Sequence, residues 1–267
     1  FKYFNSYSSA QSNEIDVLIA DESHRIRETS NSRFTPRAER TNLPQIDELF
    51  KASKVLVFLI DDKQIVRPNE IGSTSYIKKY VAKHNARIYE YELEAQFRCN
   101  GSDAFVNWVN NTLGVKRTAN VIWNMDEEFE FKIFSNPFDL VNAIRRRAEE
   151  GFTARTAAGF CWPWSDPKPD GTLVNDVKIG SFEMPWEKKT KFWEWAMDKS
   201  GLDQIGTVYT SQGFEFDYMG VIFGNDLVYD PESASWKGIR ENSEDSVVKR
   251  GKDEFANYVK NTYRVLL

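Results

Sequence analysis

Two pairs of adjacent acids, each following an apolar run, are the residues best placed to do chemistry. Asp21 and Glu22 end the run Asp16-Val-Leu-Ile-Ala-Asp21, and Asp61 and Asp62 end the run Val55-Leu-Val-Phe-Leu-Ile-Asp-Asp62. Open α/β sheets place ligands beyond the carboxyl ends of their strands. Adjacent carboxylates there suit metal-assisted phosphoryl transfer, in which one holds Mg²⁺ and the next orients a water. The alternative is an acidic strand-to-loop junction that is merely solvated.

Two further residues suit the same chemistry. Gln64 follows the second acid pair, where it could contact a terminal phosphate and the attacking water, or serve as an ordinary loop residue. Arg98, in the segment Gln96-Phe97-Arg98-Cys99, is of the type that stabilises transferring phosphate charge across a domain cleft. A single arginine is also a common surface charge.

The segment 207–217 is dense in polar residues. A strand is predicted to run into Thr210, Ser211, Gln212 and Gly213, and Glu215 and Asp217 follow. Hydroxyls and a tight turn permitted by glycine suit contact with a phosphate backbone or a ribose. The alternative is a β-turn between two strands.

The elements that position these residues predict an α/β fold with mostly parallel sheets. The first two strands, 16–21 and 55–62, are nearly continuous apolar runs, which predicts burial on both faces. Further strands are expected at 87–94, 129–134, 153–161, 207–212 and 218–223, and helices at 43–52, 102–113, 137–150 and 255–263. We expect an exposed loop over 27–41, a long loop or hairpin over 162–190 and a mobile polar insertion over 229–252.

Composition bounds the class of protein. The chain has 267 residues, of which 41% are hydrophobic, so it can build a core. Two cysteines exclude a disulfide scaffold and favour a reducing, cytoplasmic compartment. No apolar run approaches the roughly 20 residues of a membrane span, and no signal peptide opens the chain. The net charge of −5 argues against a generally basic nucleic-acid coat protein.

Two other kinds of site are weighed against the phosphate site. Cys99, Cys161, His24 and His84 lack the spacing of a structural zinc site. Five tryptophans gather in one region beside three lysines, and they either stack single-stranded bases or form a core: Trp162, Trp164, Trp186, Trp193 and Trp195, with Lys188, Lys189 and Lys191.

The signals, taken in order, resemble motifs of superfamily 1 helicases. Asp21-Glu22-Ser23-His24 resembles motif II, Asp61-Asp62-Lys63-Gln64 motif III, Gln96-Phe97-Arg98 motif IV, Thr210-Ser211-Gln212-Gly213-Phe214-Glu215 motif V and Asn261 to Leu267 the opening of motif VI. The closer resemblance is to the bacterial DUF2075 group, also described as a Schlafen group 3-like DNA/RNA helicase domain. Segments 71–73, 101–105, 158–164 and 220–224 fit that group, so the resemblance covers nearly the whole chain.

The resemblance implies roles for individual residues. Asp21 would bind Mg²⁺, and Glu22 would be the general base. Gln64 would sense the γ-phosphate of ATP, and Arg98 would act as an arginine finger. Gly213 and Glu215 would contact nucleotide, and Thr210, Ser211 and Gln212 would contact nucleic acid.

The resemblance also implies two RecA-like domains of the P-loop NTPase architecture, with ATP bound between them. Residues 1–95 would be the remainder of the first domain and residues 96–267 the second. No Gly-x-x-x-x-Gly-Lys-Ser/Thr loop occurs, and the chain stops before the Thr-Arg that completes motif VI, a finger position that Arg264 precedes. We therefore expect a fragment that does not hydrolyse ATP alone, because it lacks most of the phosphate donors.

Three function classes follow. The first is a nucleic-acid-dependent ATPase or helicase that acts on single-stranded DNA or RNA, with no membrane partner. The second is an NTP-dependent regulatory switch or protein-interaction module, which the acidic net charge favours. The third is a metal-dependent nuclease that uses Asp21, Glu22, Asp61 and Asp62.

Overall fold

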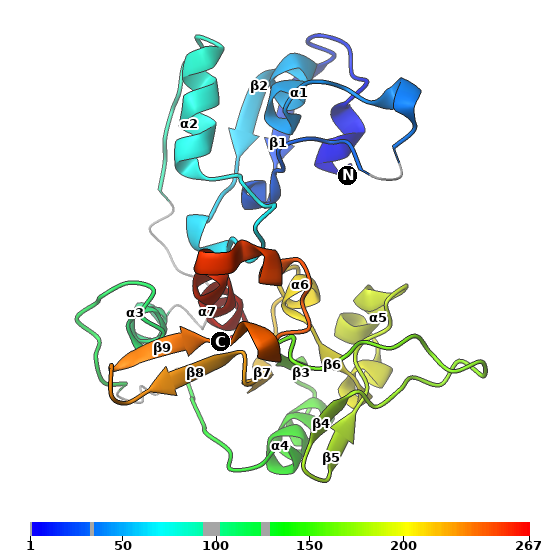
Figure 1. Cartoon of the computed structure of the whole chain (residues 1–267), viewed down its shortest axis with the longest axis vertical. Coiled ribbons are helices and arrows are strands. Elements are labelled where there is room, and N and C mark those ends of the chain that lie inside the picture. The colour runs from blue at the N-terminus through cyan, green and yellow to red at the C-terminus, as the bar shows by residue number, and fades with distance from the viewer. Residues whose placement is uncertain (1, 33–34, 93–101, 124–128) are drawn as a thin grey trace. The chain divides into compact units, whose positions relative to one another are not determined.

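The computed structural model describes residues 2–32, 35–92, 102–123 and 129–267. It falls into two compact units, residues 1–92 and residues 93–267, each described by itself below (Figure 1). Both units combine helices with small, mostly parallel sheets, which confirms the predicted α/β class.

The first unit is built on two parallel strands. β1 (Ile15–Ala20) pairs with β2 (Ser53–Phe58), and the register aligns Ala20 with Phe58 at their carboxyl ends. The other elements are α1 (Gln45–Ala52), α2 (Thr74–Lys83) and the 3-10 turns η1 (Phe4–Tyr7), η2 (Ser23–Arg25), η3 (Arg37–Glu39) and η4 (Asp62–Gln64). The helix predicted at 43–52 is confirmed, with Pro44 fixing its start.

Within the described residues of the first unit, one face of this sheet is packed and the other is open. Leu18, Leu56 and Phe58 lie against a core of Ile46, Leu49 and Ile77 supplied by α1 and α2. On the other face, Val17 and Ile19 of β1 are 55% and 63% exposed, and Val55, Val57 and Leu59 are exposed beside them. The prediction that both strands are buried on both faces is therefore wrong for this structure.

The loop over 27–41 is mostly exposed, as predicted, but it is tied to α1. The buried carboxylate of Glu48 accepts hydrogen bonds from the hydroxyls of Ser30 and Thr41. Gln45 adds a bond from its amide nitrogen to Ser30 Oγ, at 3.1 Å. The strand predicted at 87–94 is wrong for its described part, 87–92, which is irregular and exposed. Its apolar side chains Ile88, Tyr89 and Tyr91 are exposed.

The second unit has a three-stranded parallel sheet in the order β6-β3-β7. These strands are β6 (Ile205–Gly206), β3 (Ala154–Ala158) and β7 (Tyr218–Ile222). Two antiparallel hairpins are added, β4 (Val177–Ile179) with β5 (Phe182–Met184) and β8 (Leu227–Asp230) with β9 (Ser235–Gly238). The helices are α3 (Asp103–Thr112), α4 (Pro137–Glu149), α5 (Phe192–Met197), α6 (Val208–Ser211) and α7 (Phe255–Leu266), with 3-10 turns η6 (Lys199–Asp203), η7 (Arg240–Asn242) and η8 (Val248–Glu254).

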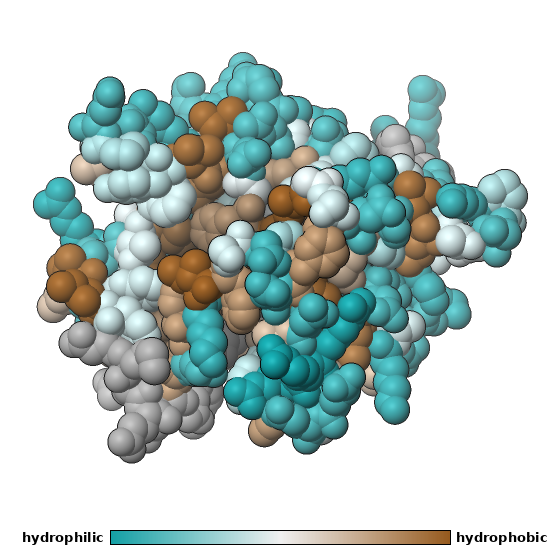
Figure 2. Space-filling view, turned by 90° about the horizontal axis from the view of Figure 1, so that it is seen from below, coloured by the Kyte–Doolittle hydropathy of each residue, from teal (hydrophilic) through white to brown (hydrophobic). Residues whose placement is uncertain are grey.

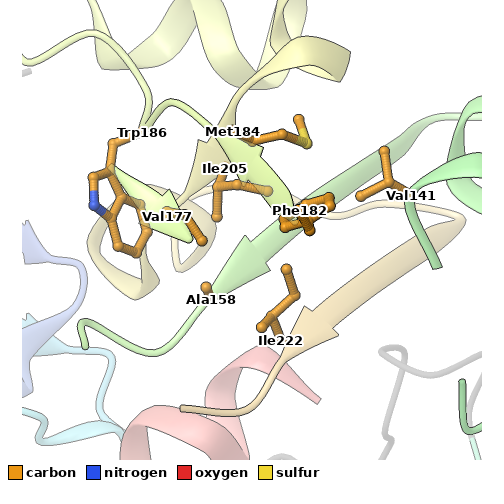
Figure 3. Close-up of a cluster of buried hydrophobic side chains, with 8 residues drawn as sticks. All are labelled: Val141, Ala158, Val177, Phe182, Met184, Trp186, Ile205 and Ile222. Atoms are coloured by element: carbon orange, nitrogen blue, oxygen red, sulfur yellow. The ribbon is translucent and has the colours of Figure 1, made fainter. Parts of the chain in front are cut away.

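The core of the second unit lies between α4, the sheet and the β4–β5 hairpin. Figure 3 shows Val141 of α4 and Phe182 of β5 close together, with Ile222 of β7 and Ile205 of β6 nearby. Trp186, which pairs with Ile205 through an isolated parallel β-bridge, belongs to the same cluster. The helices predicted at 102–113, 137–150 and 255–263 and the strands at 153–161 and 218–223 are confirmed with small shifts of their ends.

Two predictions fail in this unit outside the 207–217 segment. Residues 129–134 form no strand, because their aromatic side chains pack on Phe105 of α3 rather than along a neighbouring strand. Residues 229–252 are not a loose insertion, since they contain β9, η7 and part of η8. Trp236 of β9 connects the β8–β9 hairpin to α3, because its Nε1 donates to Thr112 O at 2.6 Å.

The surface shown in Figure 2 carries separate hydrophobic patches among hydrophilic side chains. Among the residues that the structure describes, no helix has the length and apolar character needed to cross a bilayer.

Candidate functional site

The two acid pairs of the first unit lie at one edge of the β1–β2 sheet. Leu59 N donates to Ala20 O at 3.0 Å, and Ser23 N donates to Leu59 O at 2.9 Å. These bonds continue the parallel pairing past the strand ends, so the chain leaves β1 beside the point where it leaves β2. The sheet thereby brings residues 21–24 and 61–64 to the same edge, where α/β sheets bind ligands.

Glu22 has an unusual backbone. Its φ is 52° and its ψ is 44°, in the left-handed region, which costs a residue with a β-carbon about 1–2 kcal/mol. Asp21 is exposed, and its Oδ1 accepts the Glu22 N–H at 2.9 Å. A glycine at position 22 would adopt this turn at lower cost. The presence of a glutamate there points to a requirement for its side chain.

His24 lies directly behind Glu22. It is 2% exposed, and its Nε2 lies 3.1 Å from Glu22 Oε2. Burial, and then the charge of Arg25, lower the pKa of His24 to about 4 against the opposing pull of Asp61, Asp21 and Asp62. His24 is therefore neutral at pH 7 and brings no positive charge to the Glu22 carboxylate.

The second acid pair organises the segment that carries Gln64. Asp61 Oδ1 accepts Lys63 N at 2.9 Å, and Asp61 Oδ2 accepts Gln64 Nε2 at 3.1 Å. Asp62 Oδ1 accepts Thr74 N, at the start of α2, at 2.8 Å. The side chain of Gln64 is thus oriented by Asp61, and the two aspartates hold backbone on either side of it.

Gly72 is a residue of this site that the chemical reasoning did not single out. A β-carbon there would lie 1.9 Å from Ser23 O and 2.9 Å from Ser23 C. Ile71 N and Gly72 N both donate to Ile26 O, at 2.8 and 3.2 Å. Only glycine allows this segment to pack on the 23–26 turn. The signal in the sequence was the 71–73 segment, which matched the family resemblance.

In the second unit, the segment predicted as strand 207–212 is a short helix. β6 ends at Gly206, and α6 begins at Val208 after Thr207. Ser211 N donates to Thr207 O at 3.0 Å, and Gln212 N donates to Val208 O at 3.0 Å. The strand prediction is wrong because tertiary hydrogen bonds override the β-propensity of the threonine, valine and tyrosine residues.

The polar side chains of this turn point inward. Thr210 Oγ1 donates to Glu187 Oε1 at 2.7 Å, Ser211 Oγ donates to Thr207 O at 2.8 Å, and Gln212 is also buried. Gly213 and Glu215 are exposed. A β-carbon on Gly213 would meet only Thr210 O, at 3.8 Å, so the fold itself does not require glycine there. The predicted contacts of Thr210, Ser211 and Gln212 with nucleic acid stay predictions.

Of three remaining residues, two form defined hydrogen bonds and one lies outside the described residues. Asp217 Oδ2 accepts the N–H and the hydroxyl of Thr153, at 2.8 and 2.7 Å, so Asp217 fixes the register of β3 and β7. Arg264 donates from Nε to Asn110 Oδ1 at 2.7 Å, which joins α7 to α3. Arg98, with Gln96, Phe97 and Cys99, lies outside the described residues.

The acids expected for a metal-dependent nuclease have separate places in the described structure. Within the described ranges, no group of three or more His, Cys, Asp or Glu residues is placed to hold a metal ion. Asp61 and Asp62 hold backbone amides, as described above. His84 contacts Asp47 Oδ1, at 2.6 Å, and stacks on Phe50. Asp21 is suited to Mg²⁺ that is otherwise held by phosphate oxygens and water, which needs only one or two protein carboxylates.

The tryptophan group is mainly core. Trp162, Trp164 and Trp186 donate their indole N–H groups to the carbonyls of Lys178, Glu187 and Pro163, at 2.9, 3.1 and 2.8 Å. Trp195 is fully buried. Trp193 is 46% exposed and is therefore the member of this group with the most open ring face.

Comparison with known proteins identifies the family. The Schlafen group 3 DNA/RNA helicase domain matches residues 1–267. An uncharacterized protein of Saccharomyces cerevisiae, YPL245W, is 26% identical over 234 residues, which cover 80% of this chain and 50% of the yeast protein. The chain thus spans about half the length of that relative. No solved structure gave a significant match. The chain belongs to the Schlafen group 3 DNA/RNA helicase domain family, as its motifs predicted.

Proposed function

We propose that this chain is the part of an NTP-driven helicase-like protein that carries the catalytic carboxylates, and that it couples ATP hydrolysis to action on single-stranded DNA or RNA. One observation carries the proposal. Glu22 is held in the left-handed region at the end of β1, with its carboxylate against a neutral, buried histidine. A residue with a β-carbon held in this region costs stability, and such strain is concentrated at functional sites.

The proposed mechanism assigns one task to each residue. Asp21 would hold Mg²⁺, which supplies charge stabilisation at the phosphates of ATP when both are bound. Glu22 would accept a proton from the attacking water, a task for which the neutral state of His24 leaves its negative charge in place. Gln64, oriented by Asp61, would contact the terminal phosphate or the water. Arg98 would neutralise charge on the transferring group.

Part of the second unit would bind the nucleic acid and the nucleotide. Gly213 is exposed, and the fold does not demand glycine at this position. Glycine is favoured where backbone must approach a ligand closely. We assign Gly213 and the neighbouring Glu215 to that contact, and we assign the buried Thr210, Ser211 and Gln212 to shaping the turn that presents it. Direct contact by those three would need the turn to open.

The test is steady-state ATP hydrolysis by the full-length protein, with and without single-stranded DNA or RNA. Glu22→Gln removes the base at constant size and should lower turnover by about 10²- to 10⁴-fold. Glu90→Gln is the matched control, because Glu90 is an exposed acid of the same unit, paired with Lys78 away from the site. Its turnover should equal that of the wild type.

The outcomes separate the function classes. Stimulation by one nucleic acid that is lost in Glu22→Gln supports the helicase-like reading. Hydrolysis that ignores nucleic acid, yet still requires Glu22, favours the NTP-dependent switch. Turnover that is equal in Glu22→Gln and the wild type, or no turnover in either, refutes the roles given to Asp21, Glu22 and Gln64.

A further inference from the structure

Glu187 is a carboxyl group that is built into the sheet of the second unit. It is 1% exposed. Its backbone N–H donates to Ile205 O at 2.9 Å, and its carbonyl accepts the indole N–H of Trp164 at 3.1 Å. The neighbouring Trp186 bridges Ile205. The backbone of Glu187 is therefore fixed beside the carboxyl end of β6, where α6 begins.

One carboxylate oxygen of Glu187 holds the turn that follows β6. Its Oε1 accepts the hydroxyls of Thr207 and Thr210, at 2.8 and 2.7 Å. These are the residue before α6 and the third residue of that helix. One buried carboxylate oxygen thus accepts hydrogen bonds from both ends of the first turn of α6. The second oxygen, Oε2, is buried and has no hydrogen-bond partner among the described residues.

Among the described residues, no cation is paired with Glu187 in an ion pair. Lys188 Nζ pairs with Glu194, at 2.7 Å. The guanidinium of Arg155, on β3, is bound to the carbonyls of Ala154, Trp195 and Asp198. On the far side of α6, Asp245 accepts the hydroxyl of Tyr209. A buried carboxylate without a cation is costly, and a bound proton removes that cost.

The electrostatics agree with this geometry. Burial raises the pKa of Glu187 to about 7, against the opposing effect of the two threonine hydroxyls. Both protonation states of this group are therefore populated near neutral pH. In the protonated state Oε2 carries a hydrogen and the turn bears no buried charge.

We propose that Glu187 is a positioning residue for nucleic-acid binding, which holds the 207–213 turn through two threonine hydroxyls and is protonated when a single-stranded nucleic acid is bound. This inference rests on the proposed function and deepens it by naming a residue outside the motifs. The phosphate backbone of the strand is the ligand chemistry concerned. Because a phosphate near this turn disfavours a second negative charge, binding and protonation of Glu187 support each other.

Thermodynamic linkage between protonation of Glu187 and nucleic-acid binding determines how the affinity changes with pH. If bound phosphate raises the pKa of Glu187 by about one unit, the affinity falls about tenfold as the pH rises from below 6 to above 8. Replacing Glu187 with glutamine isolates this contribution, because only the part of the pH dependence that comes from Glu187 disappears in that variant.

The experiment measures binding of fluorescein-labelled oligothymidylate and oligouridylate to the full-length protein by anisotropy across this pH range. Glu187→Gln keeps an oxygen for both hydroxyls and cannot ionise, so it should bind at every pH as tightly as the wild type does at low pH. Thr210→Val removes one hydroxyl, which should shift the midpoint of the wild-type profile to higher pH. Glu183→Gln, at an exposed acid of β5, should leave the profile unchanged.

The results separate this inference from the function on which it rests. Binding to either oligonucleotide, with a pH dependence that is lost in Glu187→Gln, supports the inference. The oligonucleotide that binds more tightly shows whether DNA or RNA is preferred. Binding with the same pH profile in Glu187→Gln and the wild type overturns the role of Glu187 and leaves the proposed function standing. No binding by the wild type to either oligonucleotide overturns both.

Discussion

Replacing Gly72 with alanine tests the packing that holds the catalytic turn. The added β-carbon would lie 1.9 Å from Ser23 O, 2.9 Å from Ser23 C and 3.1 Å from His24 Cα. All three are backbone atoms, so no side-chain rotation relieves the overlap. The two segments must separate by more than about 1 Å to restore ordinary contact. Since Ser23 follows Glu22 directly, that separation displaces the proposed base.

The expected cost combines two terms. Overpacking at a tightly packed position costs about 1–3 kcal/mol. Separation also weakens the bonds from Ile71 N and Gly72 N to Ile26 O, each worth about 1 kcal/mol. We therefore expect Gly72→Ala to destabilise the first unit by about 2–4 kcal/mol. Gly213→Ala is the matched control, because its β-carbon meets nothing nearer than 3.8 Å, and it should change stability by less than about 0.5 kcal/mol.

Hydrogen exchange followed by mass spectrometry locates the effect. All eight tryptophans lie in the second unit, so intrinsic fluorescence reports on that unit, and peptide exchange is needed for the first. Peptides that cover 15–26 and 71–77 should exchange faster in Gly72→Ala. Unchanged exchange in these peptides, or equal destabilisation by Gly213→Ala, would refute the reasoning. It would mean that the close approach at Gly72 is not what fixes the turn.

Three further predictions follow from the same structure. Glu22→Gly should leave the free energy of unfolding unchanged or raise it by up to about 1 kcal/mol, and it should abolish ATP hydrolysis. Ala234→Gly, at a residue with a φ of 47°, should have the same effect on stability and leave turnover unchanged. Because the folded-state pKa of Glu187 is raised from 4.5 to about 7, wild-type stability should fall by about 3 kcal/mol as the pH rises from 4.5 to 7. Urea denaturation followed by fluorescence should show no such fall in Glu187→Gln, and an equal fall would contradict the assignment. Val17→Thr with Ile19→Thr should reduce binding of a hydrophobic dye at a stability cost below about 1 kcal/mol per site, since both side chains are more than half exposed. Unchanged dye binding would place the apolar surface elsewhere.

Local sequence patterns predicted the elements whose stabilising contacts are close in sequence. The helix α4 has Asn136 as its N-cap, Pro137 at its first position and Gly151 just beyond its end. The helix predicted at 137–150 agrees with these local start and stop signals. The helix α3 followed from Ser102, which caps it at Phe105 N. The acid pairs after β1 and β2 were found in the same way, because strand and site are contiguous there.

The errors arose where distant residues decide the conformation. The pattern at 87–92 alternates as a strand does, but among the described residues this segment pairs with no strand. The polar stretch 229–252 is ordered by contacts from elsewhere, such as the bond from Trp236 to Thr112. Burial of β1 on both faces was expected from an apolar run, yet Val17 and Ile19 face away from the core. The sequence shows that a residue is apolar, but it does not show which neighbouring side chains cover it.

The 207–217 segment shows why a motif can be recognised correctly while the tasks of its residues differ from those the pattern suggests. Thr210, Ser211 and Gln212 were expected to bind the ligand directly, because hydroxyls beside a tight turn suit contact with phosphate or ribose. Their burial depends in part on Glu187, which lies 23 positions before Thr210 and belongs to no motif. A hydroxyl that already donates to a buried carboxyl is poorly placed to donate to a phosphate. Gly213 is exposed at the end of this turn, where its N–H donates to Thr210 O at 3.2 Å and a β-carbon would meet nothing nearer than 3.8 Å. The proposed division of labour follows, in which side chains of the motif shape the turn and its backbone meets the ligand.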